Sequence, residues 1–126
     1  MVFLNKLKIK WDDFLRVAII GSRDANEDCY NKIIENLPAE CSEIISGGAR
    51  GIDTYAKMVA QNLGIAYREY LPDYDKYGKY APIQRNKLII ENADMVLGFW
   101  NFQSRGTQST IAECIKNNIP FKIIEL

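Results

Sequence analysis

The sequence predicts an α/β protein: a parallel sheet of about five strands with helices on both faces, in three layers. Two observations lead to this fold class. Short apolar runs alternate strictly with amphipathic segments, and the links between them are short. The runs at 17–20 and 95–100 are the most apolar, which is typical of central strands covered on both faces. Placing these two runs side by side gives the strand order 3-2-1-4-5.

Each predicted element has its own signal. The strand at 66–71 carries Arg68 and Glu69 among apolar residues, which is typical of an edge strand. Pro38 stops the first helix, and Gly64 marks the end of the second. Residues 72–82 are expected to form a tyrosine- and charge-rich loop. The strands are predicted at 17–20, 43–46, 66–71, 95–100 and 121–126, and the helices at about 24–37, 53–63, 83–92 and 105–117.

The predicted helix starts contain two capping boxes and one first-turn carboxylate. Asp24-Ala25-Asn26-Glu27 fits a capping box for the first helix, and Thr110 with Glu113 fits the S/T-x-x-E pattern in the last. Asp53 begins the second helix, where a carboxylate complements the helix dipole. This structural role explains Asp53 at least as well as a ligand contact does.

Residues 16–126 are expected to form a single domain, large enough to bury about two-thirds of its unfolded surface. Residues 1–15 are an N-terminal extension. In it, Leu7, Ile9 and Trp11 alternate with lysines, which is the period of a half-buried strand. An arm that packs on a partner subunit is the alternative, and the role of the extension stays open.

Composition excludes several classes of function. The 16 basic and 16 acidic residues cancel, so overall charge gives no general attraction to nucleic acid or anionic membranes. The absence of histidine excludes His-based triads, histidine metal sites and imidazole acid–base chemistry. The three cysteines are widely spaced packing residues, so neither a metal site nor a disulfide is expected. Without a signal peptide or membrane span, the protein is expected to be soluble and cytoplasmic.

A glycine-dense turn at 47–51 joins the second strand to the second helix. Its glycines allow backbone N–H groups to point into one concavity, toward which the positive end of the helix dipole is also directed. In such a sheet, ligands bind beyond the carboxyl ends of the strands, where the winding reverses. We expect the segments 21–23, 47–51, 85–86 and 105–110 to meet there. They hold four of the six arginines, whose guanidinium groups bind phosphate through paired hydrogen bonds.

These segments predict one anion site made of glycine, hydroxyl and arginine residues. Singly, each glycine is explained equally well by a tight turn, so the prediction depends on their combination. Tyr74, Tyr77 and Tyr80 either stack on a base or cover a sheet edge or a subunit interface. The predicted ligand-binding residues are Gly21, Ser22, Arg23, Gly47, Gly48, Ala49, Arg50, Gly51, Asp53, Arg85, Asn86, Arg105, Gly106, Thr107, Ser109 and Thr110.

The same segments, in the same order, resemble the SLOG superfamily. This Rossmann-like group contains the DNA-processing protein DprA and the LOG cytokinin-activating phosphoribohydrolases. The resemblance covers about residues 16–126 and is closest to the small, stand-alone YspA-type branch. It rests on Ile20-Gly21-Ser22-Arg23, Ser46-Gly47-Gly48-Ala49-Arg50-Gly51-Ile52-Asp53, Tyr77-Gly78-Lys79, Pro82-Ile83-Gln84-Arg85-Asn86, Asn92-Ala93-Asp94 and Arg105-Gly106-Thr107.

The resemblance implies a Rossmann-like fold, a nucleotide or nucleotide-derived ligand across the glycine loops, and frequent homodimers or higher assemblies. It implies no cofactor beyond a bound nucleotide or phosphate. In LOG-type enzymes a P-G-G-x-G-T-x-x-E motif supplies a catalytic glutamate, assisted by an arginine that Arg85 matches. Thr110 stands at the glutamate position here, and a threonine cannot activate water as a carboxylate does. Glu113, one helical turn further on, is then the catalytic candidate beside Arg85.

Three functions follow, in this order. The first is the binding or sensing of a phosphorylated nucleotide derivative, with the glycine loop and Arg23 on the phosphate. The second is a nucleoside-monophosphate phosphoribohydrolase-like enzyme that uses Arg85, Glu113 and Asp53. The third is single-stranded DNA binding in the manner of DprA, ranked last because the net charge is zero and no basic stripe is present. The identity of the ligand, the oligomeric state and the pathway stay open.

Overall fold

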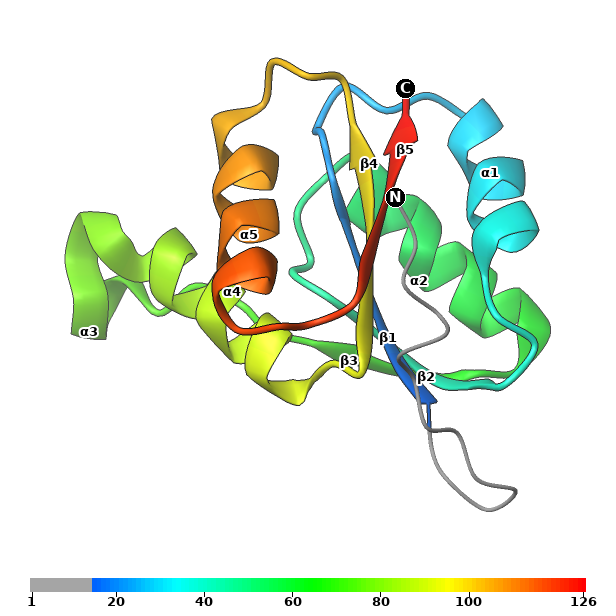
Figure 1. Ribbon diagram of the computed structural model, residues 1–126, viewed down its shortest axis with the longest axis horizontal. Coiled ribbons are helices and arrows are strands. Elements are labelled where there is room, and N and C mark those ends of the chain that lie inside the picture. Colours follow the sequence, from blue (N-terminus) through cyan, green and yellow to red (C-terminus); the bar gives the residue numbers. More distant parts are fainter. Residues whose placement is uncertain (1–14) are drawn as a thin grey trace.

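The computed structural model describes residues 15–126, which are built around a five-stranded parallel sheet (Figure 1). The strands are β1 (Leu15–Gly21), β2 (Cys41–Ser46), β3 (Ala66–Glu69), β4 (Met95–Trp100) and β5 (Phe121–Glu125). The helices are α1 (Asp28–Asn36), α2 (Ile52–Leu63), α3 (Tyr74–Tyr77), the short 3-10 helix η2 (Gly78–Tyr80), α4 (Ala81–Asn92) and α5 (Arg105–Lys116). The order β3-β2-β1-β4-β5 and the parallel pairing confirm the prediction. The strand predicted around Leu7, Ile9 and Trp11 lies outside the described residues.

The apolar run of β1 is buried on both faces of the sheet. Successive side chains of a strand point to opposite faces, so Val17 and Ile19 belong to one core cluster, and Ala18 and Ile20 belong to the other. Helices α1 and α2 cover the first face, and α4 and α5 cover the second (Figure 1). This burial on two sides is why the central strands are continuous apolar runs rather than alternating ones.

Strand β3 lies at the edge of the sheet, as its charged residues predict. Arg68 pairs with Glu43 of β2, with the Nε and Oε2 atoms 3.4 Å apart. The strand ends at Glu69, earlier than predicted, because Glu69 is in register with Ser46, the last residue of β2. The Ser46 carbonyl accepts one more hydrogen bond, from the Tyr70 N–H, and the chain then leaves the sheet.

Helix α1 begins at Asp28, and the capping box predicted at 24–27 is wrong. The cap position makes no side-chain hydrogen bond, and the Asn26 side chain instead accepts one from the Asp28 N–H at 3.1 Å. The Asp24 carboxylate accepts hydrogen bonds from the side-chain amide of Asn101, in the loop after β4. Local spacing cannot reveal this competing partner, because it is distant in the sequence.

Helix α5 is capped by Ser104, whose hydroxyl oxygen accepts a hydrogen bond from the Thr107 N–H at 3.3 Å. Thr110 lies inside the helix, and its hydroxyl donates to the Gly106 carbonyl at 2.9 Å. The predicted capping box of Thr110 and Glu113 is therefore wrong, because the helix already begins one turn earlier.

The segment predicted as a loop at 72–82 is largely helical. The Asp73 side chain accepts a hydrogen bond from the Lys76 N–H at 3.1 Å and so caps α3. Pro82 lies in the first turn of α4, where a missing N–H costs no helical hydrogen bond. Figure 1 shows α3 projecting away from the sheet. We call residues 74–80, which form α3 and η2, the arm.

Gly51 is expected to be essential for stability, because it combines a φ of 81° with close packing. A Cβ atom there would lie 2.6 Å from both the Arg23 Cα and the Ser22 carbonyl oxygen. Gly51→Ala should lower the free energy of unfolding by about 3 kcal/mol or more, through backbone strain plus overpacking. Gly64 is the control position, where φ is 67° and an added Cβ atom would meet no atom within 4 Å. Gly64→Ala should therefore lower the free energy of unfolding by only about 1–2 kcal/mol. Urea denaturation measures both, and equal losses would contradict the close packing.

Candidate functional site

A cavity of about 460 Å³ opens at the carboxyl ends of the strands. It lies where the winding of the sheet reverses between β1 and β4, as predicted for the ligand site. Its volume is in the range of small-molecule sites. The lining residues are Ile20, Gly21, Ser22, Arg23, Asp24, Gly47, Ala49, Asp53, Pro82, Arg85, Asn86, Ile89, Asn101, Ser104, Gly106, Thr107 and Thr110.

Ser22 joins three segments around the cavity. Its N–H donates to the Phe99 carbonyl at 3.1 Å, and its carbonyl accepts from the Ile52 N–H at 3.4 Å. Its buried hydroxyl oxygen accepts a hydrogen bond from the Asn101 N–H at 3.3 Å. These bonds hold the loops after β1 and β4 and the start of α2 together as one rim.

Arg85 reaches from α4 to the glycine-dense turn. Its Nη1 donates to the Gly47 carbonyl at 2.7 Å and to the Tyr70 carbonyl at 3.4 Å, and its Nε donates to the Asn86 side chain at 2.8 Å. A Cβ atom on Gly47 would lie 2.6 Å from Nη1, so a larger residue would push the guanidinium away. Within residues 15–126, Nη2 makes no hydrogen bond, and it is available to a ligand.

Asp53 places a carboxylate inside the predicted anion site. The side chain is only 8% exposed, lines the cavity, and accepts a hydrogen bond from the Ala49 N–H at 3.0 Å. Burial raises the pKa of Asp53 from 3.8 to about 6, opposed by the Ala49 N–H, the Ser46 hydroxyl and the Arg85 guanidinium. That Ser46 hydroxyl is buried and makes no hydrogen bond of ordinary geometry within the described part of the chain. One N–H of the glycine-dense turn is therefore already bound by a carboxylate.

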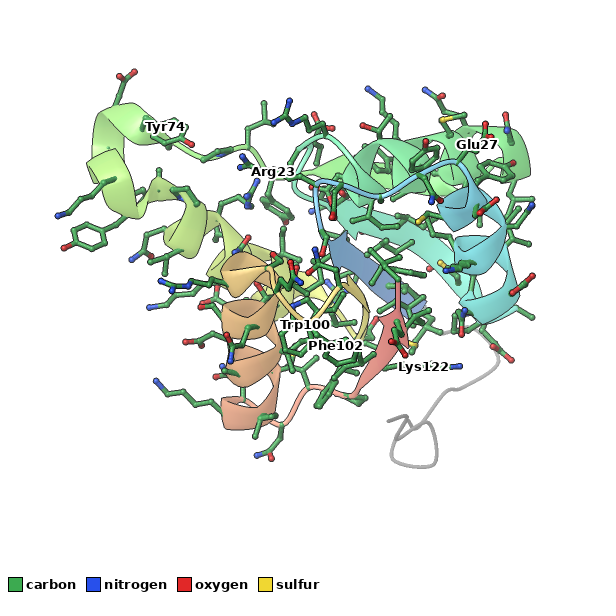
Figure 2. The ribbon with its side chains drawn as sticks, turned by 90° about the horizontal axis from the view of Figure 1, so that it is seen from above. Arg23, Glu27, Tyr74, Trp100, Phe102 and Lys122 are labelled. Atoms are coloured by element: carbon green, nitrogen blue, oxygen red, sulfur yellow. The ribbon has the colours of Figure 1, made fainter. Side chains whose placement is uncertain are left out.

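Arg23 and Arg85 bring two guanidinium groups to the cavity from different elements. Burial lowers the pKa of Arg85; Asp53 opposes this, and Arg23 lowers the pKa further. Arg23 is exposed and makes no ion pair among residues 15–126. Figure 2 shows it between the arm and the loops of the rim. Its neighbour Asp24 also lines the cavity, and the Asp24 carboxylate accepts hydrogen bonds from the Asn101 side chain.

Most of the predicted ligand-binding residues do meet at this cavity. They come from all four predicted segments, because the carboxyl ends of β1, β2 and β4 share one edge of the sheet. Those that line the cavity are Gly21, Ser22, Arg23, Gly47, Ala49, Asp53, Arg85, Asn86, Gly106, Thr107 and Thr110.

Two glycines and an arginine of the predicted turn do not line the cavity. A Cβ atom on Gly48 would meet the Glu69 side chain, so this residue faces the edge strand. Gly51 faces the backbone of the loop that holds Arg23. Arg50 is exposed and lies outside the lining. The glycine-dense turn therefore serves mainly to pack chain segments together.

Three residues of α5 also lie outside the cavity. Arg105 and Ser109 are exposed, because the helix turns its other face, with Thr107 and Thr110, toward the cavity. The catalytic candidate Glu113 accepts a hydrogen bond from the Asn117 side chain, near the end of the helix. The structure therefore does not bring Glu113 together with Arg85.

Sequence reasoning missed six lining residues. Asn101 and Ser104 follow β4 directly, so the rule that ligands bind beyond strand ends could have found them. The apolar ones carry no such signal, because they read as ordinary core positions. The missed residues are Ile20, Asp24, Pro82, Ile89, Asn101 and Ser104.

The chain is similar to proteins that process DNA. A family model of DNA recombination-mediator protein A matches residues 6–67, just under half of the chain. DNA processing protein A (DprA) from Streptococcus pneumoniae matches with a TM-score of 0.70 and 22% identity, over 89% of this chain and 50% of that one. DNA processing protein A from Helicobacter pylori, described for its single-stranded DNA binding mode, matches with a TM-score of 0.67 and 21% identity. This match covers 89% of this chain and 66% of that one. No curated protein matches the chain.

These matches confirm the predicted resemblance to the SLOG superfamily and the Rossmann-like fold. The chain spans half of the Streptococcus protein and 66% of the Helicobacter protein. Closeness to the YspA-type branch, a homo-oligomeric state and a cytoplasmic location stay predictions. Within residues 15–126, no helix is long and apolar enough to cross a membrane, and no group of three His, Cys, Asp or Glu side chains could hold a metal ion.

The raised pKa of Asp53 predicts a pH dependence of stability. Because this pKa is about 6 in the folded protein and 3.8 ordinarily, ionisation of Asp53 disfavours folding. Its contribution to the free energy of unfolding is present below about pH 4 and lost as pH rises through about 6, on the order of 2–3 kcal/mol. Asp53→Asn should lack this loss. Urea denaturation of both proteins across that range measures it, and parallel pH curves would refute it.

Proposed function

We propose, from the SLOG-type Rossmann-like fold that the chain shares with DprA proteins, that the cavity binds the phosphate of a nucleotide or nucleotide derivative. The convergence of Arg23 and Arg85 on one small cavity carries this proposal. Arginine keeps its charge at physiological pH and matches phosphate oxygens through paired hydrogen bonds. The proposed ligand needs no metal or further cofactor.

The start of α5 supports the same ligand. Gly106 and Thr107 lie in the first turn of this helix and line the cavity. The positive end of a helix dipole favours anions, and its first N–H groups are suited to phosphate oxygens. The Thr107 N–H is bonded to the Ser104 hydroxyl, so within the described residues the N–H groups of Arg105 and Gly106 are the ones left to meet a phosphate.

The rest of the cavity suits the uncharged part of a nucleotide. Ile20, Pro82 and Ile89 form an apolar part of the lining. Asn86 also lines the cavity; its side-chain oxygen accepts a hydrogen bond from Arg85, and its side-chain amide makes no hydrogen bond within residues 15–126. A sugar or base needs this combination of apolar contact and a few fixed polar groups.

Binding is better supported than phosphoribohydrolase activity. Glu113 lies outside the cavity, and the Thr110 hydroxyl is used within its own helix. Two carboxyls line the cavity: Asp53, which is engaged by the Ala49 N–H, and Asp24, which is engaged by the Asn101 side chain. Neither stands at the position of the LOG-type glutamate, which Thr110 occupies.

Arg23 tests the proposal, because it makes no ion pair in the described residues that supports the fold. We expect Arg23→Ala to weaken the binding of nucleoside monophosphates or ADP-ribose about 10- to 100-fold, the effect of losing a charge-assisted hydrogen bond. Arg105→Ala removes an exposed arginine outside the cavity and should leave the affinity within about twofold. Isothermal titration calorimetry measures both. No binding to the wild-type protein at millimolar ligand would refute the proposal.

Single-stranded DNA is the second candidate ligand. The observation that favours it is the similarity to a DNA processing protein described for its single-stranded DNA binding mode, together with the match to a DNA recombination mediator. A phosphodiester inside a strand also presents anionic oxygens, two with one negative charge, where the phosphate of a free mononucleotide presents three with close to two negative charges at pH 7. The zero net charge of the chain means that such binding would rest on the few arginines of the rim.

Salt dependence tests the second candidate. A strand held by two arginines should lose affinity with a slope of about −1 to −2 in log–log plots between about 50 and 200 mM salt, since each neutralised phosphate contributes about −0.7. Arg23→Ala should make the slope shallower by about 0.7, the contribution of one neutralised phosphate, and Arg105→Ala should not change the slope. Fluorescence anisotropy of a labelled oligonucleotide measures the slope. An unchanged slope in Arg23→Ala would place the strand elsewhere on the protein.

A further inference from the structure

The arm carries three exposed tyrosines beside the cavity. Tyr74 is 58% exposed, Tyr77 36% and Tyr80 56%. The arm continues directly into α4, which carries Arg85, and it lies apart from the sheet (Figure 1). Large aromatic rings that stay in water while grouped together are typical of sites that bind another molecule.

Two of these rings already have a partner. Lys76 places its Nζ atom 5.2 Å from the centre of the Tyr77 ring, and Lys79 places its Nζ 5.3 Å from the centre of the Tyr80 ring. A cation over a ring occupies one face of it. The Tyr74 ring has no cation or aromatic ring against it among residues 15–126, and the residue is the most exposed of the three.

Tyr74 is also the tyrosine that lies toward the phosphate-binding groups. Figure 2 shows its side chain on the side of α3 that faces the body of the molecule, in the direction of Arg23. Tyr74 lies near enough to Arg85 to influence the pKa of that guanidinium, which an ionised Tyr74 would raise. The chain leading into the arm is held by the same guanidinium, because the Tyr70 carbonyl accepts a hydrogen bond from Arg85 at 3.4 Å. An exposed aromatic ring therefore lies on the segment that leads directly into the helix carrying Arg85.

We propose that Tyr74 stacks on the nucleobase of a nucleotide whose phosphate is bound by Arg23 and Arg85. The arm is then the base-recognition element of the site, and this inference rests on the proposed phosphate binding. Every nucleobase has a face on which an aromatic ring can stack, so Tyr74 supplies affinity for a base without selecting which one. The unit recognised is a base with its phosphate, whether free or part of a single strand.

Paired ligands separate stacking from phosphate binding. Adenosine 5′-monophosphate contains the base, and ribose 5-phosphate lacks it but keeps the sugar and phosphate. We expect Tyr74→Ala to weaken binding of the first about 5- to 100-fold and to leave binding of the second unchanged, because stacking on one base contributes about that much. Tyr74→Phe keeps the ring and should bind both ligands as the wild type does. Tyr77→Ala, on the same helix, is the control and should also be unchanged. Calorimetry measures all eight affinities.

A third ligand distinguishes the two sources of the nucleotide. A short oligodeoxyadenylate is titrated against the same four proteins. Tighter binding of the oligonucleotide than of adenosine 5′-monophosphate, with the same loss in Tyr74→Ala, supports stacking within a strand. Equal or weaker binding of the oligonucleotide, with the loss in adenosine 5′-monophosphate retained, supports stacking on a free nucleotide.

Three outcomes overturn the inference, and they differ in what they leave standing. If Tyr74→Ala binds both phosphates as the wild type does, or loses affinity equally for both, Tyr74 does not contact the base. If the wild type binds ribose 5-phosphate as tightly as adenosine 5′-monophosphate, no base is recognised, while phosphate binding stands. If the wild type binds none of the three ligands, both the proposed phosphate binding and the proposed stacking are refuted.

Discussion

The cavity depends on one hydrogen bond, from Arg85 to the Gly47 carbonyl at 2.7 Å. It draws a guanidinium of α4 over the end of β2, where burial opposes its charge. A half-buried guanidinium is stable only when its N–H groups are bonded, and two backbone carbonyls and the Asn86 oxygen satisfy part of this need. The nearby Asp53 carboxylate opposes the lowering of the Arg85 pKa, and burial raises the pKa of Asp53 to about 6. The hydrogen bonds that hold the guanidinium all end on uncharged oxygens.

The parallel sheet brings the loops around this local arrangement together at one cavity. Its strands end along one edge, so the loops after β1, β2 and β4 meet without long excursions of the chain. Ser22 then ties two of these loops to the start of α2 through its N–H, carbonyl and hydroxyl. The charged side chains that line the cavity are thus Arg23, Arg85, Asp24 and Asp53, two of each sign.

The fold could be predicted because it follows from patterns that the chain carries locally. The apolar runs of β1 and β4 identify the centre of the sheet, and the charges of β3 identify its edge. The details of the site could not be predicted in this way. Asp24 is bound by Asn101 and so does not cap its own helix, and the phase of α5 decides that Thr107 lines the cavity and Arg105 does not. Such choices depend on distant partners and on side-chain direction, which spacing alone does not encode.

Gly51 illustrates how a residue can shape a site that it does not line. Its missing side chain lets the start of α2 approach the Arg23 backbone, and a single added carbon would have to force the two apart. The glycine therefore sets how closely the loop that carries Arg23 lies against the start of α2. The backbone position of a residue that lines the cavity is thus fixed by one that does not.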